Sequence, residues 1–115
     1  MLNGQQVYTI VEQMSQYPGG KDALMRFLSQ HTIYPILKEG EQALSKVIVT
    51  FIIDADGKVI NECICKPSSS KSLHPLEQET LKIARLLPDW KPGKQKGKRV
   101  PVRYYLPIIY ELDDD

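Results

Sequence analysis

The sequence predicts a single α+β domain in which two helices pack on one face of a three-stranded antiparallel sheet, with a short extended segment at the N-terminus. Three observations lead to this prediction. The chain has 115 residues, about the size of one domain. Two segments carry apolar residues at helical spacing, and residues 46–65 have the composition of two strands joined by a turn. The order short strand, helix, hairpin, helix, long strand is most economically assembled with both helices on one face of the sheet.

Composition divides the chain into three parts. We expect residues 7–110 to form the domain, residues 1–6 to be disordered or of cloning origin, and the acidic residues 111–115 to be a frayed, solvated tail. Residues 7–11 combine β-branched and aromatic side chains, which favours a short extended segment. The turn formers of residues 17–20 then end that segment.

The first helix is expected to begin at Lys21 and to end before Tyr34 and Pro35. The residue before a proline is pushed out of the helical region of backbone space, so this pair marks the boundary. Between these limits one stripe of side chains recurs at intervals of three and four residues, as on one face of a helix. The stripe consists of Leu24, Phe27, Leu28 and His31.

The segment from Lys46 to Asp54 is the clearest strand. Apolar side chains occupy both of its faces, which is typical of the central strand of a sheet. Asp54–Gly57 has the composition of a hairpin turn, and Val59–Cys65 is the expected return strand. The aspartates of the turn do not begin a calcium-binding loop, because Val59 and Cys65 stand where such a loop needs glycine and glutamate.

The second helix is expected to follow a Ser-rich loop at residues 67–72. Pro75 suits the first helical position, and His74 before it is a candidate for a weak cap. Acidic residues lie near the start of this helix and basic residues near its end, which complements the helix dipole. Pro88 ends the helix.

The last part of the domain contains a tryptophan turn, a basic loop and the final strand. Trp90 lies in the turn at residues 89–93, and we expect it to cover the end of the core between the second helix and the sheet. Lys94–Lys98 is the expected loop. From Val100 to Tyr110 the apolar residues alternate with polar ones, which predicts a strand with one buried face.

The charge pattern gives no reason to expect a nucleic acid or an anionic membrane as partner. The net charge is +1, and five of the 15 basic residues lie within residues 91–99. A solvated loop is the favoured interpretation of this cluster. The alternative is a phosphate-facing loop with Trp90, Tyr104 and Tyr105 nearby for stacking. No apolar run reaches the length of a membrane span, and residues 1–6 do not resemble a signal peptide, so either the protein stays where it is made or the chain is a fragment.

No motif of an enzyme or a metal site is present in the sequence. It contains no nucleophile elbow, no zinc-protease helix and no phosphate-binding loop. Cys63 and Cys65 are too close in an extended strand for an unstrained disulfide, and we expect them to be small apolar residues on a half-buried face. We therefore expect no enzymatic activity, no cofactor and no metal.

The two prolines of the final strand carry structural information. Pro101 and Pro107 are six residues apart, so their backbones face the same side of the strand, and proline is tolerated where that side is an open edge. Arg103 and Tyr105 would then offer free N–H and C=O groups between them. Two interpretations remain equally supported: an edge blunted against aggregation, or a docking site for an extended segment of a partner.

An ordered set of motifs extends over about residues 7–110. It consists of Tyr8–Met14, Tyr17–Gly20, Ala23–Met25, Phe27–Leu28, Tyr34–Pro35, Val47–Asp54, Asp56–Gly57 and Pro88–Lys94. This set resembles the C-terminal domain of the TonB energy-transducer family, in the variant common in Bacteroidetes-type bacteria. Two departures from the family are Ser45, where a glycine is frequent, and the longer Ser-rich loop at residues 67–74.

The resemblance implies a periplasmic binding module of an inner-membrane-anchored protein whose anchor is missing from this chain. The family works with a proton-driven motor complex in the inner membrane, and a homodimer is compatible with it. It grips the N-terminal box peptide of outer-membrane receptors by strand addition to its last strand and transmits force for active transport. The same domain is also appended to other membrane proteins, including sensor-peptidase-like chains, so a periplasmic interaction or sensing domain is the alternative.

Site residues follow from the resemblance by position. The pairing strand corresponds to residues 100–109, and the segment before Tyr34 lies where the family approaches the receptor plug. The expected partner-binding residues are Val100, Val102, Arg103, Tyr104, Tyr105, Leu106, Ile108, Ile109, His31, Thr32 and Ile33. The residues of the expected structural motif are Tyr34, Pro35, Trp90, Pro92 and Gly93.

Overall fold

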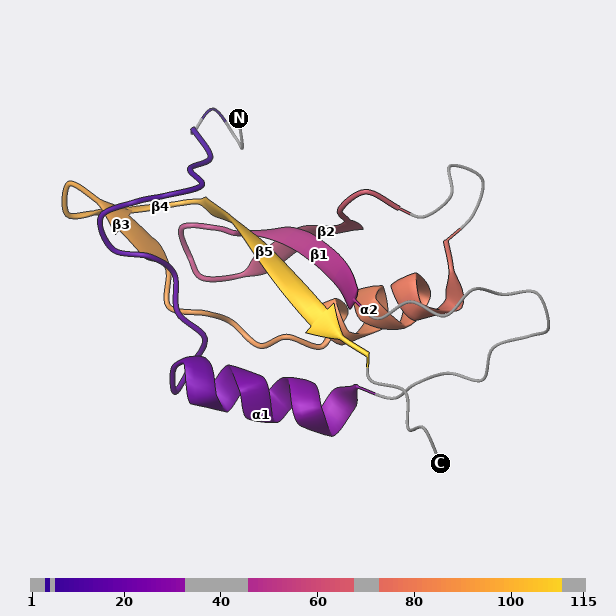
Figure 1. Ribbon diagram of the computed structural model, residues 1–115. Helices are drawn as coiled ribbons and strands as arrows, with labels where there is room; N and C mark the ends of the chain where they lie inside the picture. The colour runs from indigo at the N-terminus through magenta and orange to yellow at the C-terminus, as the bar shows by residue number, and fades with distance from the viewer. Residues whose placement is uncertain (1–3, 5, 33–45, 68–72, 111–115) are drawn as a thin grey trace.

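The computed structural model describes residue 4 and residues 6–32, 46–67 and 73–110. Two helices and an antiparallel sheet form the α+β fold that the sequence predicts (Figure 1). The elements in chain order are α1 (Lys21–His31), β1 (Lys46–Ile53), β2 (Val59–Ile64), α2 (Pro75–Arg85), β3 (Gly93–Gln95), β4 (Lys98–Val100) and β5 (Val102–Ile109). Ile33, Tyr34, Pro35 and Ser45 lie outside the described residues.

The main sheet has three antiparallel strands in the order β2-β1-β5. The central position of β1 is confirmed, and its pairing with β5 runs without interruption from Lys46 opposite Ile109 to Ile53 opposite Val102. The turn between β1 and β2 is closed by the Asp54 side chain, because its Oδ1 atom accepts hydrogen bonds from the amides of Asp56 and Lys58, both at 2.9 Å.

A bulge in β2 changes the face on which Cys63 lies. Thr50 pairs with Cys63 but Ile52 pairs with Ile60, so two β2 residues lie opposite Phe51. One of the two, Asn61, adopts a positive φ of 55°. Without the extra residue Cys63 would face the core, whereas in the structure it is exposed. The expectation of a half-buried position is therefore wrong for Cys63, although Cys65 is half-buried.

Both helices cover the same face of the sheet and share one hydrophobic core. In Figure 1, α1 lies beneath β5, and α2 lies beneath the end of β1 and β2. The helices contribute Leu24, Leu28, Leu76, Ile83 and Ala84. The sheet contributes the alternate residues Val47, Val49, Phe51, Ile53, Leu106 and Ile108. Apolar burial on this face is the main force that holds the layers together.

The start of α2 is capped as the sequence suggests. His74 Nδ1 accepts a hydrogen bond from the Leu76 amide at 3.1 Å, and Glu77 Oε1 accepts one from the His74 amide at 2.8 Å. This reciprocal arrangement satisfies amides that the first turn leaves without partners. Directly after β5, the Tyr110 hydroxyl lies 2.9 Å from Thr80 Oγ1 of α2. Burial raises the pKa of the Tyr110 hydroxyl, so it stays protonated and holds the sheet against α2.

The expected basic loop is instead a second, two-stranded hairpin. β3 and β4 pair from Gly93 opposite Val100 to Gln95 opposite Lys98. Lys96 and Gly97 both have positive φ, as a tight two-residue hairpin turn requires. Val100 therefore belongs to β4, and the last strand begins at Val102 rather than at Val100, because Pro101 interrupts the pairing.

We expect amide exchange to be slowest at Ile48–Ile52. These residues lie in β1, which is paired on both sides, and Val49 and Phe51 are fully buried. Such amides open only when the sheet unfolds as a whole. Hydrogen–deuterium exchange read by NMR checks this. Protection that is concentrated in Val59–Ile64 instead would contradict the central position of β1.

Candidate functional site

β5 forms one edge of the main sheet, and its odd-numbered residues direct their backbone groups away from β1. Two hydrogen bonds show this orientation. The Pro101 carbonyl accepts from the Tyr8 amide at 3.1 Å, and the Arg103 amide donates to the Tyr8 carbonyl at 2.8 Å. The parity of the two prolines predicted this side correctly.

Residues 8–16, which we call the N-terminal strap, occupy the first part of this edge. Tyr8 forms a parallel bridge with Val102, and farther along the strap bridges connect Gln13 with Lys94 and Gln16 with Lys91. In Figure 1 the strap follows the β3–β4 hairpin and then turns down into α1. The Arg103 amide is thus bonded within the chain, and the expectation that it is open is wrong.

The second part of the β5 edge, beyond Arg103, is not covered by the strap. Among the described residues, hydrogen bonds on the outer side of β5 stop at Arg103. Beyond that point the outward residues are Tyr105, Pro107 and Ile109, and Pro107 offers only a carbonyl. The side chains of Tyr105 and Ile109 are 51% and 55% exposed. This stretch is the open window of the edge.

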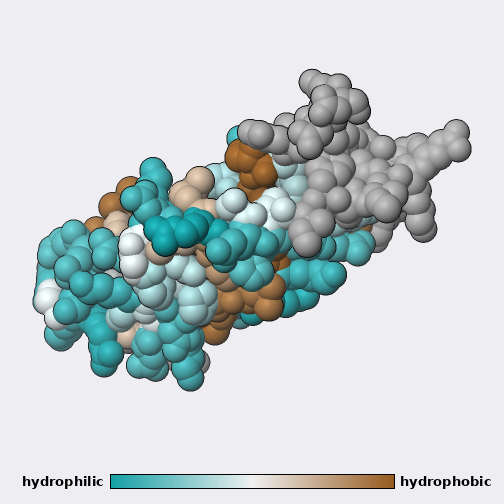
Figure 2. Space-filling model, turned by 90° about the horizontal axis from the view of Figure 1, so that it is seen from below, coloured by the Kyte–Doolittle hydropathy of each residue, from teal (hydrophilic) through white to brown (hydrophobic). Residues whose placement is uncertain are grey.

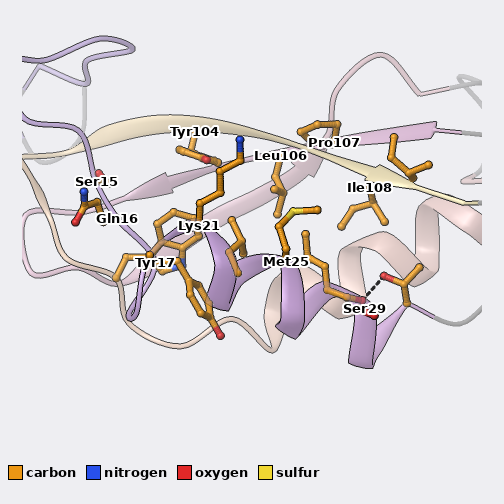
Figure 3. A pocket seen from close by; sticks show the side chains of 16 residues that line it. Ser15, Gln16, Tyr17, Lys21, Met25, Ser29, Tyr104, Leu106, Pro107 and Ile108 are labelled. Atoms are coloured by element: carbon orange, nitrogen blue, oxygen red, sulfur yellow. Dashed lines mark hydrogen bonds between the residues drawn. The ribbon is translucent and has the colours of Figure 1, made fainter.

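A groove of about 640 Å³ lies between α1 and this open window. In the close view, Met25 extends from α1 toward Leu106 and Pro107, and Lys21 extends toward Tyr104 (Figure 3). The rest of its lining is mostly apolar, including Leu24, Leu28, Ile108 and Ile109. Seen from the α1 side, hydrophobic patches interrupt a mainly hydrophilic surface (Figure 2).

One end of the groove is polar, and it is built around Trp90. The Trp90 side chain is only 4% exposed and meets three aromatic rings edge-on, with ring centroids 5.0 Å from Tyr104 and 5.7 Å from Tyr17 and Phe51. Two side-chain atoms here, Trp90 Nε1 and Ser15 Oγ, are buried without a hydrogen-bond partner among the described residues. Both residues line the groove.

The other end of the groove lies at the C-terminus of α1. The Thr32 amide donates to the Leu28 carbonyl at 2.8 Å and closes the helix, and Thr32 lines the groove. His31 is turned to Phe27, with the rings stacked at 4.2 Å and Nδ1 2.8 Å from the Phe27 carbonyl. Of the segment expected to approach a receptor, Thr32 therefore reaches the groove, whereas His31 packs on its own helix.

The expected partner-binding residues of β5 separate into two faces. Val102, Tyr104, Leu106 and Ile108 face the core, and their backbone groups are directed toward β1. Arg103 and Tyr105 lie on the other face, where Arg103 Nη1 is 3.3 Å from Thr50 Oγ1. The sequence reasoning missed the α1 side of the site. The available signal in the sequence was Met25, an apolar residue next to the helical stripe. In the structure the Met25 side chain is 56% exposed.

Neither metal ligands nor a membrane helix is found in the part of the chain that the structure describes. No group of three or more His, Cys, Asp and Glu side chains there could hold a metal ion. No helix there is long and apolar enough to cross a membrane.

A comparison with protein families identifies one match. The family model described as Gram-negative bacterial TonB protein C-terminal matches residues 30–112. No curated protein and no solved structure matches the chain. The matched region contains the whole main sheet and α2, whereas the strap and most of α1 precede it.

Proposed function

The chain belongs to the TonB C-terminal family, whose domains are periplasmic and associated with transport rather than catalysis, and we propose that it grips the N-terminal box peptide of an outer-membrane receptor. The grip is strand addition to the open window of β5. Force for active transport would then reach the receptor from a proton-driven motor complex in the inner membrane, through an anchor of this protein.

The open window carries this proposal. Tyr105 and Ile109 direct their amides outward, and the carbonyl of Pro107 lies between them on the same side. An extended peptide can pair with such an edge through backbone groups alone. Each bond contributes about 0.5–1.5 kcal/mol net, so the few bonds that this short window offers support weak binding, roughly in the micromolar to millimolar range. Binding of this strength suits a cycle of grip and release.

The strap sets the register of the added strand. Because Tyr8 already occupies the edge at Pro101 and Arg103, a partner meets free backbone only from Tyr105 onward. A longer partner strand would have to displace the strap and its two hydrogen bonds to β5.

Titration of a receptor box peptide into isotope-labelled domain tests the proposal. We expect the largest amide shifts at Tyr105 and Ile109, because these outward amides gain new hydrogen-bond partners, and only small shifts in α2, which packs against β1 and β2. The measurement is a series of NMR correlation spectra. A peptide with proline at alternate positions is the control, since it cannot pair and should produce no shifts. Shifts that cluster on α2 or on the outer edge of β2 would contradict strand addition to β5.

A further inference from the structure

We propose that the β3–β4 hairpin is a contact surface for an anionic phospholipid membrane. The surface, which we call the basic tip, consists of Lys91, Lys94, Lys96, Lys98 and Arg99. In Figure 1 the hairpin projects beyond the start of β5, whereas the open window lies toward the end of that strand. The inference is therefore independent of strand addition at the open window.

The fold concentrates positive charge that the net charge of the chain conceals. The whole chain carries only +1, but residues 91–99 contain five basic residues and no acidic one. Within the part of the chain that the structure describes, none of the five forms an ion pair. Glu12 is the acidic side chain that is hydrogen-bonded to the hairpin there, because its Oε2 atom accepts from the Lys96 amide at 3.3 Å. The basic tip thus keeps an excess of positive charge, and all of its side chains except that of Lys94 are fully exposed to solvent.

The pairing within the hairpin places like charges side by side. Lys94 lies directly opposite Arg99. The Lys94 amide donates to the Gln13 carbonyl at 2.7 Å, and the Lys94 carbonyl accepts from the Gln13 amide at 3.1 Å, so these groups face the strap rather than β4. The Lys94–Arg99 pair therefore has no hydrogen bonds of its own, and in such pairs the opposite side chains lie closest. Like charges at these positions destabilise a sheet, and a bound anion relieves their repulsion.

The surroundings of the basic tip favour a membrane over a nucleic acid. Trp90 is 4% exposed and meets Tyr104 edge-on in the core, so neither ring is free to stack on a base. An exposed apolar side chain is present instead. Ile10 is 83% exposed, in the part of the strap between its bridges to β5 and to β3. Basic residues beside an exposed apolar side chain are typical of surfaces that bind at a lipid–water interface.

The distribution of the charges favours a flat partner over an extended acidic peptide. Side chains alternate between the faces of a strand, so Lys94 and Arg99 share one face of the hairpin and Lys98 lies on the other. Lys96 lies in the turn between them. A peptide strand would contact one of these faces, whereas a layer of phosphates can receive all sides of a projecting tip. Since the family is periplasmic, the phospholipid leaflets that face the periplasm are the surfaces within reach.

Cosedimentation with lipid vesicles tests this inference. The probes are vesicles of phosphatidylcholine alone and vesicles of phosphatidylcholine and phosphatidylglycerol in equal parts. We expect the wild-type chain to bind the mixed vesicles, to ignore the neutral ones, and to dissociate as the salt concentration rises. Each basic residue at an anionic surface contributes about fivefold to affinity, so Lys98→Gln combined with Arg99→Gln should weaken binding about 25-fold. Ile10→Ser should weaken it several fold, and Lys98→Arg combined with Arg99→Lys should preserve it.

A matched variant removes the same charge from another surface. Lys82 and Arg85 are exposed on α2, and their joint replacement with Gln should change vesicle binding less than about twofold, because salt screens charges far from the contact. A thermal melt checks the fold. The hairpin variant should melt no lower than the wild type, since Arg99→Gln removes one member of the like-charge pair.

Several results would overturn the inference. They are absence of binding to the mixed vesicles, equal binding to neutral vesicles, and an equal loss in the two double Gln variants. Tighter binding of polyglutamate than of the mixed vesicles would also overturn it and would assign the basic tip to an acidic polypeptide. None of these results bears on strand addition, which the titration with the box peptide reads at Tyr105 and Ile109.

Discussion

Replacing Trp90 with alanine is expected to lower the free energy of unfolding by about 3–5 kcal/mol, the usual cost of truncating a large buried aromatic side chain. Trp90 is 4% exposed and is surrounded by three aromatic rings, so little can collapse into the space that it leaves. Its backbone is equally constrained. The Trp90 amide donates to the Gly57 carbonyl at 2.6 Å, and a Cβ atom at Gly57 would lie 2.0 Å from the Trp90 carbonyl oxygen. The β1–β2 turn therefore rests directly on the tryptophan segment.

Urea unfolding followed by far-UV circular dichroism measures this change. Ile10→Ala is the matched control, because Ile10 is also apolar but 83% exposed, and it should change stability very little. Trp90→Phe should fall between the two, since it keeps a ring in the cluster. If Trp90→Ala unfolded at the same urea concentration as the wild type, the Trp90 ring would not stabilise the core, and a role in binding a partner would be favoured instead.

The parts of the fold that could be predicted are those with a regular apolar period. β1 has apolar residues on both faces, and this pattern correctly predicted its central place. The helical stripe of α1 predicted the face that this helix buries, and Pro75 with His74 predicted where α2 begins. In each case local sequence and tertiary packing favour the same structure.

The parts that were missed depend on strand pairing that the composition does not reveal. The β3–β4 hairpin is rich in lysine and short, so its composition predicted a solvated loop, whereas in the structure its two strands pair with each other and β3 also bridges to the strap at Gln13. The bulge at Asn61 leaves no clear pattern in β2, and it moved Cys63 to the outer face. Neither feature has a local signal that outweighs the non-local contacts.

The site was predictable in orientation but not in extent. Pro101 and Pro107 identified the outward side of β5, because a missing N–H is tolerated only where no neighbouring strand needs it. The extended character of residues 7–11 does not say which sheet edge they join. The sequence therefore could not predict that the strap covers Arg103. The groove depends on the place of α1 beside β5, and this follows from packing rather than from any motif.

Replacing Tyr105 with proline is expected to weaken binding of the box peptide at least about tenfold. The substitution removes the first free amide after the strap and places a ring where the partner backbone must approach. Loss of one backbone hydrogen bond costs about 0.5–1.5 kcal/mol, and the steric effect adds to it, so a tenfold change, which corresponds to 1.4 kcal/mol, is a lower bound. The fold should tolerate the change, because Pro107 already occupies an equivalent outward position opposite Ile48.

Tyr105→Ala separates the backbone from the side chain. It keeps the amide and removes a ring that is 51% exposed, so affinity should stay within a few fold of the wild type if backbone pairing carries the binding. Isothermal titration calorimetry gives the affinities, and the amide exchange of Ile48–Ile52 shows that the sheet is intact in both variants. Equal affinity of the proline variant and the wild type would refute strand addition at this edge. A loss as large for alanine as for proline would instead assign the binding to the Tyr105 side chain on the outer face, where it lies beside Arg103 and Thr50 rather than in the groove.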